Sequence, residues 1–476
     1  MEGTWRDAED GKLEEYPIEQ GSVDSTAQMN VFLKAGSEAV VYFWITAGKN
    51  LEEVETLHNF VVEENPEKLL KNSINYWKSW VNKEPERISS LPNDLKKHYK
   101  QSVLIMRTQI DNRGAIIAAN DSDIMKFNKD TYTYMWPRDG GWVSLALDRA
   151  GYGEISKRFF EFCADVITES GYLLHKYNPD HSLGSSWHPW YKDGKPNLPI
   201  QEDETGIVVH ALHEHFHQFG DIEFVQKMYE PLVKKPGNFM MDYVDKVTGL
   251  PLPSYDLWER EYGVFSYTAA TVYAGLMAAA HLSEILGHFN HHRRYEKAAS
   301  DIKTAILKHL YDEESGRFLK RIQCTEDGEV IKDYGLDASM HALWMFGVLP
   351  PNDERIMRTN QAIADTLSVH TIGGLARSEN DDYQRVNADY HGIPGNPWII
   401  TTLWHAQWKL ALAQSEADLK EVRGWIDWTI KYMNPAGLLP EQINPFNGDP
   451  LSVAPLTWSH ATFVDTVLKY NEKLRG

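Results

Sequence analysis

FSYTAATVYAGLMAAAHLSEILG, residues 265–287, is a run of small and apolar side chains with the 3.6-residue apolar period of an α-helix. Eleven further segments share this period: 93–110, 139–151, 154–169, 203–219, 221–245, 291–311, 337–347, 353–367, 396–415, 417–433 and 458–473. No fixed sequence repeat relates them, which argues against a solenoid. The chain is therefore predicted to be all-α over most of its length.

Twelve helices in about 380 residues predict a closed toroid of inner and outer helices, because each helix pair buries its apolar face on the next pair. Alternate connections are long and rich in Trp, Tyr, Pro, Gly and carboxylates: 112–138, 171–202, 246–264, 368–396 and 434–457. Loops of this kind on a rigid scaffold commonly carry function. We expect these five to form the walls of one pocket.

The N-terminal region has a different pattern. MNVFLKAGSEAVVYFWIT, residues 29–46, contains two apolar runs around a Lys-Ala-Gly-Ser turn, which predicts a β-hairpin. A lone hairpin is marginally stable, so it either packs on the larger domain or ends a β domain whose earlier part is absent. Residues 50–83 follow as a charged linker with a helix after Pro66.

Composition excludes several function classes. The 68 acidic and 48 basic side chains give a net charge of −20, which repels nucleic acid and anionic membranes but is compatible with a neutral substrate. No apolar run is long enough to span a bilayer, and the acidic N-terminus is no signal peptide, so a cytoplasmic protein is expected. Cys163 and Cys324 lie far apart, and no HExxH motif occurs, which argues against a metal site. We expect no cofactor.

Two glutamates are candidates for acid–base chemistry. Glu259 follows Leu257 and Trp258 in PSYDLWEREYG, where an apolar ring can keep a carboxylic acid protonated; the alternative is an exposed acid before a helix. Glu441 lies between Pro440 and Pro445, in a stiff segment that suits a positioned base. Glycoside hydrolysis needs such a pair of carboxyl groups.

Aromatic and charged residues accompany these acids. In YTYMWPRDGGWV, residues 132–143, Arg138 and Asp139 can grip sugar hydroxyls while Tyr132 and Trp136 offer ring faces; alternatively, Asp139 is only a helix N-cap. Further stretches join aromatic and charged groups beside helix starts: GSSWHPW (184–190), PIQEDET (199–205), GGLARSENDDY (373–383) and GNPW (395–398).

Together these motifs, in this order, resemble the glucoamylase family of glycoside hydrolases, family fifteen, which also holds glucodextranases and some trehalases. The matching stretches span nearly the whole chain: WRDAEDG (5–11), MWPRDGGWVSLALDRAGY (135–152), SLGSSWHPW (182–190), LPIQEDETG (198–206), PSYDLWERE (253–261), GGLARSEND (373–381), PGNPWIITTLWHAQW (394–408) and GLLPEQ…PLTWSHA (437–461). The family's fold is an (α/α)6 barrel, which agrees with the twelve predicted helices.

The resemblance implies a domain organisation. Prokaryotic members carry a β-sandwich and a helical linker before the barrel, so residues 1–49 are expected to be the remnant of a sandwich, 50–90 the linker, and 91–476 the catalytic barrel. An N-terminally truncated chain would also have lost any signal peptide, which weakens the expectation of a cytoplasmic protein.

The resemblance also implies an inverting mechanism with Glu259 as general acid and Glu441 as general base. The matched positions expected to bind substrate are Tyr132, Trp136, Arg138, Asp139, Trp187, Glu202, Trp258, Arg377 and Trp398. Arg260 stands where many glucoamylases have a second glutamate, so linkage preference is open, and we expect its side chain to point away from Glu259.

The predicted activity is exo-acting release of glucose from the non-reducing ends of α-linked glucans or oligosaccharides. Trehalose, and α-1,6-linked dextran or isomaltose, are alternative substrates on the same scaffold, although family trehalases tend to have a GIWE-like phrase in place of DLWE. A non-catalytic glucan-binding or regulatory module and a phosphorolytic enzyme are alternatives of other classes. The oligomeric state is left open.

Overall fold

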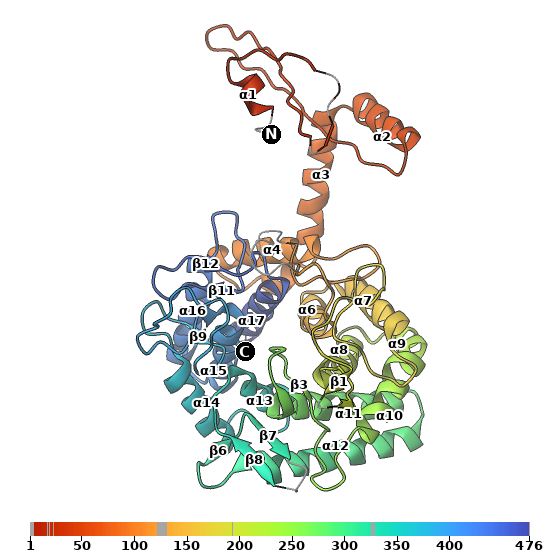
Figure 1. Ribbon diagram of the computed structural model, residues 1–476, viewed down its shortest axis with the longest axis vertical. Helices are drawn as coiled ribbons and strands as arrows, with labels where there is room; N and C mark the ends of the chain where they lie inside the picture. Colours follow the sequence, from red (N-terminus) through yellow and green to blue (C-terminus); the bar gives the residue numbers. More distant parts are fainter. Residues whose placement is uncertain are drawn as a thin grey trace. The chain divides into compact units, whose positions relative to one another are not determined.

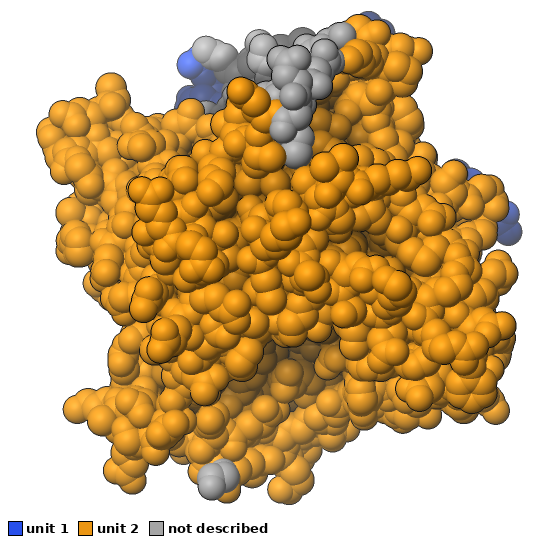
Figure 2. Space-filling model, turned by 90° about the horizontal axis from the view of Figure 1, so that it is seen from below, with its two compact units in different colours: residues 1–78 blue, residues 79–476 orange. Residues whose placement is uncertain are grey.

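The computed structural model describes residues 4–475 except 17, 19, 22, 121–130, 193 and 325–328. The chain divides into two compact units, Met1–Lys78 and Ser79–Gly476, which Figure 2 distinguishes by colour. Among the described residues, no helix is both long and apolar enough to cross a lipid bilayer.

The centre of the larger unit is a ring of helices that are buried along much of their length. Each member contacts the next one, and the last contacts the first, so the ring is closed (Figure 1). In order these inner helices are α6 (Pro137–Arg149), α8 (Glu202–Phe219), α11 (Ser266–Ile285), the 3-10 turn Ala338–His341 with α13 (Ala342–Met345), α15 (Ile399–Leu412) and α17 (Thr457–Arg475).

A second layer of helices surrounds this ring. Its members are α4 (Asn93–Thr108), α7 (Gly153–Val166), α9 (Ile222–Met228) continued through the π-helical residues Tyr229–Lys234 into α10 (Lys235–Asp242), α12 (Phe289–His309), α14 (Glu354–Leu367) and α16 (Glu416–Lys431). They are amphipathic: α12, for example, buries Tyr295, Ala299, Ile302 and Ile306 at helical spacing and leaves its other face in solvent. Each predicted segment corresponds to a helix or helical run here, and the (α/α)6 barrel is confirmed.

The inner helices pack closely because small residues lie between them. A Cβ atom added to Gly275 of α11 would lie 2.9 Å from the Cα atom of Gly206 in α8. Glycine at both positions therefore allows the two backbones to approach.

The long connections all lead into the N-terminal ends of inner helices, and short strands tie them together. One four-stranded sheet joins β9 (Leu375–Ala376), β10 (Pro397–Trp398), β11 (Gln442–Ile443) and β12 (Pro450–Leu451). A second four-stranded sheet joins β3 (Ser254–Tyr255), β4 (Tyr262–Phe265), β7 (Arg321–Cys324) and β8 (Val330–Asp333). The remaining strands form two pairs: β1 (Tyr191–Lys192) with β2 (Lys195–Pro196), and β5 (Tyr311–Asp312) with β6 (Arg317–Phe318). The loop at 311–337 is a sixth long connection, which the sequence did not single out.

The N-terminal unit contains α1 (Trp5–Ala8), α2 (Leu51–Glu64) and most of α3 (Pro66–Val81); the short 3-10 turn Pro85–Ile88 follows in the larger unit. The helix predicted after Pro66 is present. The amide of Ser37 donates to the carbonyl of Lys34, so the predicted turn forms, but no strand is assigned on either side of it among the described residues. The division at residues 49 and 90 stays a prediction.

Candidate active site

A cavity of about 480 Å³ opens at the end of the barrel where the inner helices begin. All five predicted loops contribute to its wall. Ten of the eleven predicted site residues line it: Tyr132, Trp136, Arg138, Asp139, Trp187, Trp258, Glu259, Arg377, Trp398 and Glu441. Its volume lies within the range of small-molecule sites, about 300–1,000 Å³.

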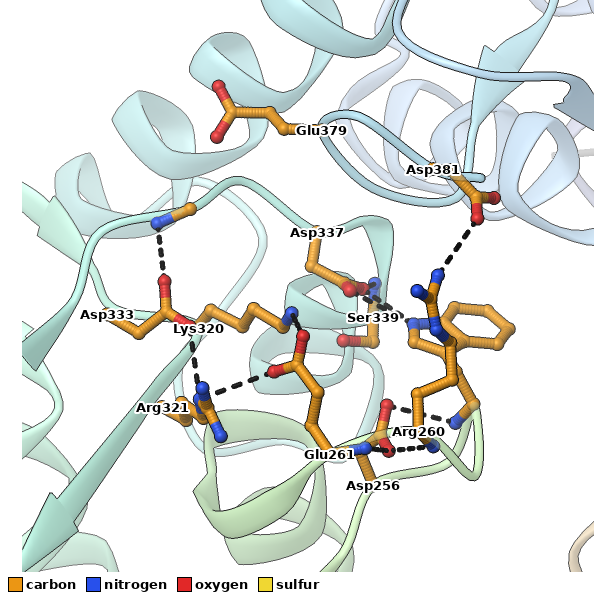
Figure 3. Close-up of polar contacts among 12 residues, drawn as sticks. Asp256, Arg260, Glu261, Lys320, Arg321, Asp333, Asp337, Ser339, Glu379 and Asp381 are labelled. Carbon is orange, nitrogen blue, oxygen red and sulfur yellow. Dashed lines mark hydrogen bonds and ion pairs between the residues drawn. The ribbon is translucent and has the colours of Figure 1, made fainter. Parts of the chain in front are cut away.

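Glu259 lies in a tight turn between β3 and β4, and the carboxylate of Asp256 holds that turn (Figure 3). Asp256 Oδ1 accepts hydrogen bonds from the backbone amides of Arg260 (2.8 Å) and Glu261 (2.7 Å), and Oδ2 accepts from the amide of Trp258 (3.3 Å). Glu259 itself has φ +64°, in the left-handed region. Asp256 therefore supports the loop that carries Glu259.

The two side chains that follow Glu259, Arg260 and Glu261, form ion pairs with other segments (Figure 3). Arg260 Nη1 lies 3.3 Å from Asp381 Oδ1, and Nη2 lies 2.7 Å from Asp382 Oδ1. Glu261 pairs with Lys320 at 2.9 Å and Arg321 at 3.3 Å. Arg260 thus forms its ion pairs with the 378–382 loop and not with Glu259, as expected, and it lines the outer part of the cavity.

The carboxylate of Glu259 faces cationic partners. Arg138 Nη2 donates to Oε1 at 3.3 Å, and His175 Nε2 lies 3.1 Å from Oε2. Burial favours the neutral acid, but His175, then Arg138 and Lys176, outweigh it and lower the pKa of Glu259 to about 2. The raised pKa that the sequence predicts for Glu259 beside Leu257 and Trp258 is therefore wrong, because Arg138 and Lys176 act on the carboxylate as cations.

Glu441 has the opposite environment. It is 5% exposed, its backbone amide donates to the carbonyl of Val453, and its Oε2 accepts from Gln442 Nε2 at 2.9 Å. Burial raises the pKa of Glu441, while the bond from Gln442 and the charge of Arg377 oppose that rise. Gln442 of β11 pairs with Trp398 of β10, and this strand pairing holds the segment that carries Glu441 beside the cavity.

Arg138 and Asp139 occupy the first turn of α6. Pro137 is at position N1 and Trp136 is the N-cap, so the alternative of Asp139 as N-cap is wrong. Asp139 is 6% exposed, and burial raises its pKa to about 7 although Arg138 lowers it. Arg138 also donates to the side-chain oxygen of Gln201 at the start of α8, which fixes the guanidinium between two inner helices.

Aromatic rings surround a second buried guanidinium. The Arg377 Cζ atom lies 4.9 Å from the ring centroid of Trp398, 5.3 Å from that of Tyr383 and 5.4 Å from that of Trp258. Its Nη2 atom donates to Asp381 at 2.6 Å. Trp258 Nε1 donates to both oxygens of Asp337, at 3.0 Å, which orients the indole toward the cavity.

Lys176, which the sequence did not single out, also lines the cavity, and its neighbour His175 lies near Glu259 without lining it. Lys176 is fully buried, with its Nζ 4.1 Å from the ring centroid of Trp187 and 4.9 Å from that of Trp136. The indole Nε1 of Trp187 donates to the carbonyl of Glu259 at 3.3 Å. His175 and Lys176 come from YLLHKY, a segment whose only sequence signal is two polar groups after an apolar run.

Glu202 does not belong to this set. It is fully buried in the first turn of α8 and does not line the cavity. Successive helical residues point about 100° apart, so the residues of this turn that approach Arg138 are its neighbours Asp203, at 3.5 Å, and Glu204, at 3.7 Å. Substrate contact by Glu202 has no support from this position and stays a prediction.

A second cavity, of about 550 Å³, lies among other parts of the inner helices. Trp142 and Trp404 line it, and both rings contact Trp458, which lines the first cavity. Trp458 therefore links the wall of the first cavity to two indoles that line the second. Within the described part of the chain, no group of three His, Cys, Asp or Glu side chains is placed to hold a metal ion.

Two carboxylates that face one cavity inside a double ring of helices are an arrangement suited to glycoside hydrolysis. A family model described as glycosyl hydrolases family 15 matches residues 93–423, and the chain belongs to that family.

Individual relatives and structures agree with this family. An uncharacterized glycosyl hydrolase of Methanocaldococcus jannaschii is 31% identical over 428 residues, which are 87% of this chain and 63% of that protein. A trehalase of Sulfolobus acidocaldarius is 22% identical over 79% of this chain and 63% of its own length. The chain thus spans a little less than two thirds of these relatives. The fold is similar to that of a bacterial glucoamylase crystallised with acarbose, with a TM-score of 0.71, 22% identity, and coverage of 89% of this chain and 62% of that one.

Proposed function

We propose that the chain is the catalytic part of an inverting, exo-acting glycoside hydrolase that releases glucose from the non-reducing ends of α-linked glucans or oligosaccharides. Glu259 is the general acid that protonates the departing oxygen, and Glu441 is the general base that activates a water molecule. The observation that carries the proposal is that these two carboxylates, 182 positions apart in the sequence, line the same aromatic cavity.

The shape of the cavity supports exo action. Trp458 lines it and contacts Trp142 and Trp404, so we expect this cluster of indoles to block one end and a sugar chain to enter by its terminus. The buried pair Arg138 and Asp139 lines the cavity and is expected to bind hydroxyl groups of a terminal sugar. Charged hydrogen-bonding groups fixed on rigid helices are well suited to such recognition.

The pKa shifts of the two glutamates favour a second assignment, in which the two roles are exchanged. The pKa of Glu259 is lowered to about 2 and that of Glu441 is raised, whereas a general acid must carry a proton when the substrate is bound. Glu441 as acid and Glu259 as base is therefore the alternative to test.

The test compares Glu259→Gln and Glu441→Gln on two kinds of substrate. On maltose each variant is expected to lose about 10²–10⁴ in turnover, the usual contribution of general acid or base catalysis. On α-glucosyl fluoride, whose leaving group needs little protonation, the variant that lacks the acid recovers most of its rate and the variant that lacks the base does not. Recovery by Glu441→Gln would reverse the assignment, and unchanged turnover of either variant on maltose would remove its role.

Substrate linkage needs a separate comparison. The relatives include trehalases and glucoamylases, and trehalose or α-1,6-linked glucans are alternatives that use the same two carboxylates. Glucose release from maltose, isomaltose, dextran and trehalose is measured side by side. We expect the highest kcat/KM on α-1,4-linked substrates; a preference for trehalose would establish the alternative, and inactivity on all four would overturn the substrate class.

A further inference from the structure

The second cavity, of about 550 Å³, is bounded by the same inner helices as the first but by later positions on them. Helix α6 contributes positions 138 and 139 to the first cavity and 142–149 to the second, and α17 contributes 458 to the first and 461–469 to the second. On α8 the wall positions 210, 214 and 217 recur every three or four residues, so they share one face of the helix. The volume is that of a small-molecule site.

Indole rings form the apolar part of this wall. Trp142, Trp344 and Trp404 line the cavity, and the first two are only half-buried, so that ring surface stays accessible. The centroids of Trp142 and Trp404 lie 6.0 Å apart, and Trp142 Nε1 donates to the hydroxyl of Tyr267 at 3.2 Å, which fixes the ring. Fixed aromatic rings offer the apolar surface on which the C–H groups of a sugar ring can pack.

The cations of the wall are already paired with acids. Asp465 lies 2.7 Å from Lys469 Nζ and 2.8 Å from Arg149 Nε, and all three residues line the cavity. A second acid of the wall, Asp148, lies 3.0 Å from His215 Nδ1. An anionic ligand would have to compete with these carboxylates for the two cations, which is unfavourable away from water. The wall therefore suits a neutral ligand.

Two polar groups, one turn apart on α8, are available to such a ligand. His210 forms no hydrogen bond with a described side chain, and burial lowers its pKa to about 4, so at neutral pH one ring nitrogen donates and the other accepts. Glu214 Oε1 lies 3.2 Å from His213 Nδ1, while its Oε2 has no hydrogen-bond partner among the described residues. A neutral imidazole beside a carboxylate oxygen matches neighbouring hydroxyl groups, which both donate and accept.

We propose that the second cavity binds a neutral hexose sugar, with the indole rings as its apolar wall and His210 and Glu214 as partners of its hydroxyl groups. The site is distinct from the candidate active site, since neither Glu259 nor Glu441 lines it. Binding there needs no hydrolysis, so the inference goes beyond the proposed function and does not depend on it.

The test uses fluorine NMR of the full chain labelled with 5-fluorotryptophan. The resonance of Trp344 is assigned with Trp344→Phe and reports the second cavity, whereas that of Trp187 reports the first. On titration with glucose, the Trp344 resonance is expected to shift saturably with a Kd of about 1–10 mM, the affinity typical of a ligand with a dozen non-hydrogen atoms. Glucose 6-phosphate is expected to bind about tenfold more weakly, because its charge finds no free cation in the wall.

Two variants locate the site, and a third serves as the matched control. His210→Leu is expected to raise the Kd read from Trp344 about tenfold, since a hydroxyl group then faces an apolar side chain. Glu214→Gln keeps the shape of a half-buried side chain, leaves the fold intact, and is expected to raise the Kd about three- to tenfold. His98→Leu replaces another half-buried histidine, on α4 and outside both cavity walls, and is expected to leave the Kd unchanged.

Several outcomes would overturn the inference. A Trp344 resonance that moves with neither glucose nor cellobiose would show that no sugar enters. An equal Kd in the wild type, His210→Leu and Glu214→Gln would mean that the signal is transmitted from the first cavity. Tighter binding of glucose 6-phosphate would refute the neutral ligand. A normal Trp344 response in a protein that hydrolyses no glucan would instead contradict the proposed function alone.

Discussion

Replacement of Asp256 should disable the site without removing any group that meets the substrate. Its carboxylate accepts three backbone amides around Glu259, two of them at 2.7 and 2.8 Å, and it is 2% exposed. Hydrogen bonds to a charged acceptor contribute about 1.5–3 kcal/mol each. Loss of the two short bonds in Asp256→Ala is therefore expected to cost about 3–4 kcal/mol of stability, partly relieved by water that enters the turn.

The same change should lower turnover by about 10²-fold, since a carboxylate displaced by roughly 1 Å loses most of its catalytic alignment. Asp256→Asn is the matched control: it keeps one acceptor oxygen, so its loss of activity is expected to stay below about tenfold. Steady-state kinetics on maltose and thermal unfolding of both variants give the two effects. An Asp256→Ala enzyme with wild-type kcat and wild-type Tm would show that the turn is held by something else.

Two further predictions concern the barrel. Burial raises the pKa of Asp465, but Lys469 at 2.7 Å and Arg149 at 2.8 Å outweigh burial and hold this pKa below 3.8. The ionised carboxylate therefore stabilises the fold above pH 3.8, and this contribution is lost as the pH falls through the lowered pKa. The Tm difference between wild type and Lys469→Gln should accordingly be clear at about pH 7 and shrink below about pH 4; an equal difference at both would contradict it. Gly275→Ala should lower stability by about 1–3 kcal/mol, because its Cβ would meet backbone atoms of Gly206 at 2.9 Å, and an unchanged Tm would mean that the two helices separate freely.

Helix positions could be predicted from the sequence because burial imposes a period on the chain. The α12 segment alternates buried and exposed residues with the turn of a helix, so its position and outer face follow from the sequence alone. Residues 29–46 have the pattern of strands, yet no strand is assigned there among the described residues. A strand needs a neighbour to accept its hydrogen bonds, and a local pattern does not say whether the neighbour exists.

The site was predictable where a residue's type and local context were distinctive. Glu259 beside Trp258, and Glu441 between prolines, carry such signals, and both line the cavity. His175 carries no such signal, because the feature that brings it into the site is its contact with Glu259, 84 positions away in the sequence. For the same reason the sequence did not show that Asp203 and Glu204, rather than Glu202, lie near Arg138: it gives the first turn of a helix but not the direction from which Arg138 approaches it.

The backbone of Glu259 lies at φ +64°, a conformation that costs a side-chain-bearing residue about 1 kcal/mol and a glycine almost nothing. Glu259→Gly would relax the turn, but it would also remove the carboxylate that pairs with Arg138. Because the lowered pKa of Glu259 means that its ionised form stabilises the fold at neutral pH, the variant is expected to be less stable as well as unable to donate a proton. The left-handed backbone is thus a cost that the contacts of the carboxylate itself outweigh, as is common for strained residues at functional sites.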